Sequence, residues 1–107
     1  MRTRLAGLAL AVAVGFAATA AQAFECPAHF ANAEDAVAQA TEAMNGMSDG
    51  ADKGLVHTLI DDAKMLLESG KHNHAKPAAG GYDHARAIAK AEAAIGYAEA
   101  ARIMASR

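Results

Sequence analysis

The sequence predicts an all-α protein, a three-helix up-down-up antiparallel bundle that follows a cleaved signal peptide. An uncharged apolar run follows two arginines at the start of the chain. Beyond it, apolar side chains recur at helical spacing in three stretches, and no stretch alternates as a strand would. Two segments with glycine, residues 46–50 and 70–81, separate the three stretches. Short connections of this kind favour antiparallel neighbours in a bundle.

The first 23 residues have the pattern of an export signal. Arg2 and Arg4 precede an uncharged apolar run at residues 5–18, and residues 21–23 (Ala-Gln-Ala) have the small-x-small form of a cleavage site. The apolar run is short for a membrane span of about 20 residues, so no membrane anchor is expected. The mature chain should begin at Phe24 and should be periplasmic or secreted.

The expected helical bundle domain, residues 24–107, follows a signal peptide at residues 1–23 and is small and acidic. Loss of Arg2 and Arg4 lowers the number of basic residues from 10 to 8, against 12 acidic residues, which leaves a net charge of −4. A negative surface does not suit phosphate backbones, and without tryptophan the chain has few stacking platforms for bases. Nucleic acid is therefore not an expected partner.

The chain has one cysteine, so it cannot form the internal disulfide that commonly stabilises a small exported domain. A metal ion, oligomerisation or close helix packing must supply that stability instead.

The first helix is expected at residues 27–45. Pro27 suits the first helical position, where its missing N–H costs nothing, and Cys26 then becomes the N-cap. Gly46 is the expected end of the helix. Helical spacing places one set of apolar side chains on the buried face: Phe30, Ala33, Val37, Ala40 and Met44.

The second helix is expected at residues 52–69, with Asp52 at its start and Gly70 just beyond its end. Its apolar face is the clearest in the chain: Leu55, Val56, Leu59, Ile60, Ala63, Leu66 and Leu67. The opposite face carries His57 and Asp61, which have the spacing of an ordinary surface pair.

The third helix is expected at residues 83–105, with Asp83 as its N-cap. It is so rich in alanine that two faces compete for the core. One face contains Ile88, Ile95 and Ile103, and the other contains Tyr82, Ala89, Ala93, Tyr97 and Met104. Glu92 and Glu99 are expected at the bundle edge in salt bridges to lysine or arginine.

An up-down-up bundle brings the start of the first helix, the end of the second and the start of the third to the same pole. Side chains far apart in the sequence therefore converge there: Cys26, His29, His72, His74 and His84. His57 lies at the other pole. Imidazole and thiolate are the ligands of copper, zinc and nickel, so this pole is the predicted transition-metal site.

Two short motifs support this prediction. Cys26-x-x-His29 puts two ligands in one helical turn, with the cysteine exposed at a helix start that favours the thiolate. His72-x-His74 is a short chelating pair on a flexible segment. The alternative is that all five are solvated capping and loop residues.

The predicted function is metal binding or storage, and the protein is not expected to be an enzyme. No Gly-x-Ser-x-Gly motif or phosphate loop is present, and a single cysteine excludes Cys-x-x-Cys-His haem attachment. Two alternatives stay open: a non-metal helical interaction module and an accessory subunit. An unpaired Cys26 would also allow a disulfide-linked homodimer.

Three segments carry a resemblance to known proteins: residues 56–64 (VHTLIDDAK), His72-Asn73-His74 and residues 83–92 (DHARAIAKAE). Over about residues 55–101 the chain resembles short, exported, uncharacterised proteobacterial helical proteins. More distantly, it is similar to the periplasmic small metal-binding protein family, helical bundles that take up copper and other divalent metals through histidine. This chain has far fewer histidines, so the resemblance implies one or two sites and not high-capacity buffering.

Overall fold

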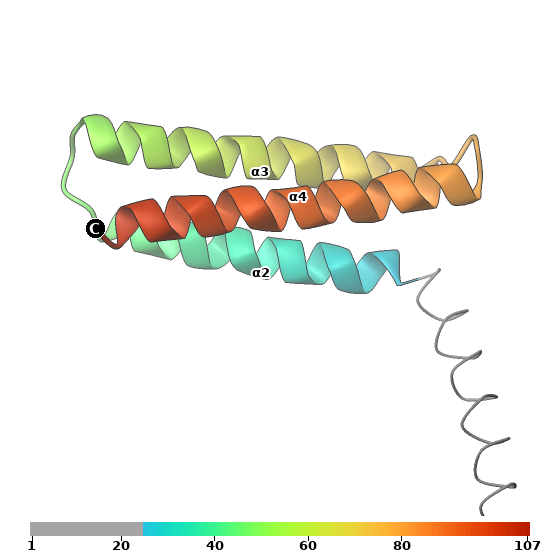
Figure 1. The fold of residues 1–107 in the computed structure, drawn as a ribbon, viewed down its shortest axis with the longest axis horizontal. Helices are drawn as coiled ribbons and strands as arrows, with labels where there is room; N and C mark the ends of the chain where they lie inside the picture. The colour runs from blue at the N-terminus through green and yellow to red at the C-terminus, as the bar shows by residue number, and fades with distance from the viewer. Residues whose placement is uncertain (1–24) are drawn as a thin grey trace, which may run out of the picture.

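A computed structural model describes residues 25–107, so the predicted signal peptide and the expected new terminus at Phe24 lie outside the described residues. The chain forms three helices: α2 at Cys26–Asn45, α3 at Ala51–Ala75 and α4 at Gly81–Ala105. Figure 1 shows them side by side, each antiparallel to the next along the chain. The prediction of an all-α, up-down-up bundle is confirmed. None of the described helices is long and apolar enough to cross a membrane.

The start of α2 differs from the prediction by one residue. Glu25 is the N-cap, without a side-chain cap hydrogen bond, and Cys26 is already helical. The prediction that Cys26 caps the helix is therefore wrong. Because a helix rotates about 100° per residue, this difference decides which way the thiol points. Cys26 lies one turn before Phe30 on the same stripe, and both are buried.

The predicted end of the second helix at Gly70 is also wrong, because α3 continues to Ala75. Gly70 is buried at the contact of α3 with its two neighbours. A Cβ placed there would lie 3.0 Å from the Ala87 carbonyl oxygen and 3.4 Å from Cε1 of Phe30. This glycine is required for close helix packing and not for a turn. Among residues 25–107, the glycines with positive φ are Gly50 and Gly80, at the starts of α3 and α4.

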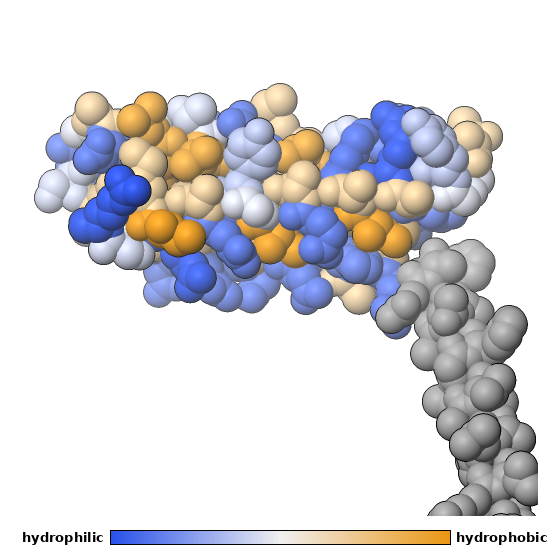
Figure 2. All heavy atoms as spheres, viewed as in Figure 1, coloured by the Kyte–Doolittle hydropathy of each residue, from blue (hydrophilic) through white to orange (hydrophobic). Residues whose placement is uncertain are grey.

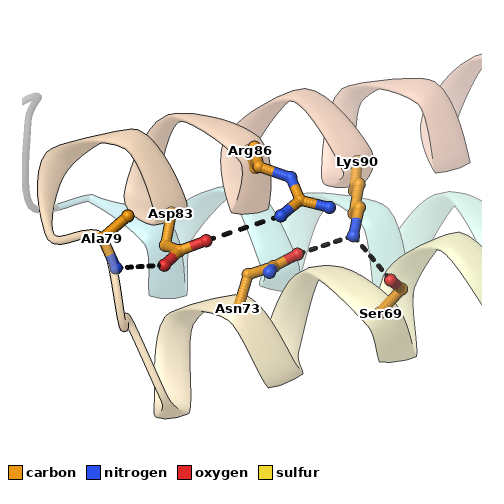
Figure 3. A network of polar contacts seen from close by, with 6 residues as sticks. All are labelled: Ser69, Asn73, Ala79, Asp83, Arg86 and Lys90. Atoms are coloured by element: carbon orange, nitrogen blue, oxygen red, sulfur yellow. Dashed lines mark hydrogen bonds and ion pairs between the residues drawn. The ribbon is translucent and has the colours of Figure 1, made fainter.

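The α3–α4 connection is held by polar contacts, drawn in Figure 3. Asp83 is not the predicted N-cap, a position that Gly80 takes. Its buried carboxylate instead accepts a hydrogen bond from the Ala79 N–H (2.6 Å) and pairs with Arg86 (3.6 Å). One turn further on, Lys90 Nζ donates to Ser69 Oγ (2.7 Å) and Asn73 Oδ1 (2.6 Å). These contacts fix the end of α3 against the start of α4.

The core confirms most of the predicted faces of α2 and α3. The buried apolar side chains of these helices, apart from Cys26, are Phe30, Ala33, Val37, Ala40, Val56, Ile60, Ala63 and Leu67. Leu59 and Leu66 pack at the edge of the core, whereas Leu55 is exposed.

Neither predicted face of the third helix forms the core. α4 buries a stripe of alanines instead: Ala87, Ala91, Ala94, Ala98 and Ala101. Ile88 and Ile95 lie at the edge of the core, and Tyr97 and Ile103 are exposed. Small side chains let α4 approach both neighbours closely, so the larger residues are displaced to the rims.

Candidate metal centre

Cys26, His74 and His84 meet at the pole where α2 begins, α3 ends and α4 begins, at the right of Figure 1. Each offers one donor atom, and the three atoms lie within 4.8 Å of one another. Cys26 Sγ is 3.9 Å from His84 Nδ1, and the two imidazole ring centroids are 5.4 Å apart. These three residues could hold a metal ion.

Each of these residues continues a buried stripe of its helix to the end of the bundle. Cys26 precedes Phe30 by one turn, and His74 follows Gly70 by one turn. His84 precedes Ala87 in the same manner on α4. Residues three or four apart share a helix face, so the packing that forms the core also turns these three side chains toward one another.

Burial determines the protonation of the thiol. Cys26 is 0% exposed, and the loss of solvation raises its pKa above the ordinary value of 9.0. The predicted exposed thiolate is therefore wrong, and without an ion the sulfur carries its proton at neutral pH. Sγ contacts the carbonyl oxygen of His84 at 3.8 Å, where the thiol can donate a weak hydrogen bond. A bound cation would have to displace this proton.

His74 supplies an independent indication of a ligand. Its Nδ1 atom is buried and has no hydrogen-bond partner among the described residues. A buried nitrogen without a partner costs about 1–3 kcal/mol, so such atoms are uncommon in native proteins. The ring lies edge-on to Phe30, with centroids 5.6 Å apart, which covers one side of the cluster with an apolar wall. A metal ion bound through this nitrogen would satisfy it.

The spacing of the donors is close to that of a coordinated ion. Metal–sulfur and metal–nitrogen bonds of about 2.3 and 2.0–2.1 Å hold the two atoms about 3.5–3.8 Å apart in tetrahedral or trigonal geometry. The sulfur and His84 Nδ1 are separated by 3.9 Å. All three donor atoms lie within 4.8 Å of one another, so the set would have to contract slightly around a bound ion.

His29 does not join this cluster. It lies one turn after Cys26, but its Nδ1 contacts Glu92 Oε1 at 2.7 Å on the surface between α2 and α4. Glu92 is thus at the bundle edge as predicted, although its partner is histidine and not lysine or arginine. The sequence offered no direct signal for this pair, because its members are 63 positions apart.

His72 is exposed, on the far side of α3 from His74. Two positions along a helix correspond to a rotation of about 200°, so both imidazoles cannot reach one ion. The predicted chelating pair on a flexible segment is wrong, because this segment is the last turn of α3. His57 pairs with Asp61 (3.3 Å) near the start of α3, away from the cluster.

The fold and the cluster together define a small three-helix bundle with a cysteine and two histidines at one pole that could hold a metal. No family model, curated protein or solved structure matches the chain. The resemblance to the small metal-binding family stays a prediction.

Proposed function

We propose that the protein binds a single transition-metal ion through Cys26, His74 and His84, in a binding or storage role and not in catalysis. The observation that carries this proposal is the approach of three donor atoms, one from each helix, to within 4.8 Å of one another. One thiolate and two imidazoles select copper, zinc or nickel over magnesium and calcium, which prefer oxygen ligands. The unpartnered His74 Nδ1 supports the same conclusion.

We further propose that the protein acts in the periplasm or outside the cell. The support is the pattern of residues 1–23, with Arg2 and Arg4 before the apolar run and Ala21-Gln22-Ala23 after it. Mass spectrometry of the protein isolated from its native host should give an N-terminus at Phe24. An N-terminus at Met1 would contradict export by this route.

The metal proposal is tested on the tag-free mature chain, residues 24–107. After incubation with Zn(II) and removal of free ions by gel filtration, elemental analysis should find one zinc per chain. Cys26→Ala, His74→Ala and His84→Ala should each reduce the bound metal at least tenfold, because each removes one of three ligands. Circular dichroism of each variant checks that the helices are retained.

His57→Ala and His72→Ala are the matched controls, since both histidines are exposed and lie outside the cluster. They should keep one zinc per chain. The site at this pole would be contradicted if the cluster variants bound as much zinc as the unaltered chain. It would also be contradicted if the two control variants lost as much zinc as the cluster variants.

A helical interaction module is the second candidate, and one surface feature favours it. Leu59, Ala93, Gly96, Tyr97 and Ala100 line a shallow apolar groove between α3 and α4. Figure 2 shows one face of the bundle, on which apolar groups are separated by hydrophilic side chains. A mature chain that binds neither zinc nor copper would favour this second candidate.

A further inference from the structure

We propose that the pole cluster is a mononuclear copper site of the trigonal type, in which one cysteine and two histidines hold Cu(II) as a thiolate complex. This inference rests on the proposed function and specifies its metal. It is carried by the number of donors, by what surrounds them and by the burial of a single sulfur.

The donor set is complete at three among the described residues. The cluster contains Cys26, His74 and His84, and no other cysteine, histidine, aspartate or glutamate belongs to it. Two ligand-type residues close in sequence to the cluster are otherwise engaged: Asp83 binds the Ala79 N–H and Arg86, and His29 binds Glu92. Structural zinc sites normally take four protein ligands, and a zinc ion held by three completes its shell with water, whereas square-planar or octahedral nickel needs at least four ligands. One cysteine and two histidines are the in-plane ligands of trigonal copper.

The surroundings of the sulfur match this type of site as well. Trigonal copper sites carry only a weak axial partner, which is a methionine or, in some proteins, an oxygen such as a backbone carbonyl. Met44, Met47 and Met104 lie near the opposite pole, and Met65 is exposed in α3. The carbonyl oxygen of His84 lies 3.8 Å from Cys26 Sγ and is therefore an oxygen that could provide such a weak contact.

Burial of Cys26 is what would preserve a Cu(II)–thiolate bond. Exposed thiolates are oxidised by Cu(II): two thiolates give up one electron each, two Cu(II) become two Cu(I), and the sulfurs join in one disulfide. Cys26 is the only cysteine in the sequence and is 0% exposed, so two sulfurs cannot meet while the bundle is folded. On binding, the thiol proton is released to solvent and the sulfur bonds to the ion. Phe30, packed against His74, helps to shield the bond from water.

The test is a titration of the mature chain with Cu(II), followed by absorption and electron paramagnetic resonance. An intense visible thiolate-to-copper charge-transfer band should grow to one copper per chain. Ascorbate, which supplies one electron per copper, should bleach it by forming Cu(I), and ferricyanide should restore it. Cys26→Ala should abolish the band, whereas His72→Ala should leave it unchanged. The electron paramagnetic resonance spectrum of the unaltered chain also reports whether copper is bound to a thiolate, so the test does not depend on the folding of any variant.

Two outcomes would overturn the copper inference and leave the metal-binding function intact. One is zinc bound at the cluster while Cu(II) produces only colourless Cu(I) and disulfide-linked dimers. The other is a weak copper spectrum that Cys26→Ala does not alter, which would place copper on surface histidines. A chain that binds neither zinc nor copper would overturn the inference and the proposed function together.

Discussion

Replacing Gly70 by valine should remove about 3 kcal/mol from the free energy of unfolding, the upper part of the range for overpacking a core. A Cβ at this position would lie 3.0 Å from the Ala87 carbonyl oxygen, 3.3 Å from Lys90 Cβ and 3.4 Å from Phe30 Cε1. A backbone oxygen in a helix cannot move aside alone, so α3 and α4 would have to separate. Against a total stability of about 5 kcal/mol for a small domain, the loss should be evident in urea denaturation.

Gly96→Val is the matched control. Gly96 is also in a helix interior, but no atom lies within 4 Å of a Cβ placed there. Valine has a slightly better helix propensity than glycine, so this change should leave stability within about 0.5 kcal/mol. Equal effects of the two substitutions would mean that the helices do not cross closely at Gly70.

Gly70 also shows where sequence reasoning reaches its limit for the fold. A glycine after an amphipathic stretch indicates a helix end as readily as a close helix contact. Only the partner decides, and here the partners are Ala87, in the next helix, and Phe30, 40 positions earlier. The amphipathic faces of α2 and α3 were predictable because their apolar side chains contrast in size and polarity with the rest.

For α4 that contrast is missing. Alanine covers most of its circumference, so hydrophobic periodicity gave two competing faces, marked by Ile88 and Tyr97. The structure buries Ala91 and Ala94 instead, because close approach of α2 and α3 to a small-residue stripe excludes larger side chains. Three-dimensional complementarity selected this stripe, and the sequence of one helix does not contain that information.

The pole of the candidate site was predictable from topology, whereas its membership was not. His74 and His72 differ by two positions, and which one faces inward depends on α3 continuing past Gly70. His29 has an equally good position in the sequence, but Glu92 binds it on the surface. Cys26 points inward because the helix begins one residue earlier than its proline indicates. Each outcome depends on where a helix begins or ends, to within a few residues, or on a partner far away in the sequence.

Zinc at about 100 times the dissociation constant should raise the stability of the mature chain by about 2.7 kcal/mol, provided that only the folded state binds. For a domain of this size, that corresponds to a rise in Tm of about 10–20 °C. The gain arises because an ion held by Cys26, His74 and His84 links all three helices. Addition of a chelator should reverse it, and differential scanning calorimetry measures both steps.

His74→Ala and His72→Ala separate this linkage from nonspecific binding to histidine. His74→Ala should abolish the zinc-dependent rise in Tm and leave the metal-free Tm nearly unchanged, because it also removes the unpartnered buried Nδ1. His72→Ala, two positions away on the exposed face of the same helix, should retain the full rise. If both variants lost the rise equally, zinc would be bound outside the cluster; if neither did, His74 would not be a ligand. Because the two alanines have the same helix propensity and lie in the same final turn of α3, any difference between them reports the direction in which the removed imidazole points.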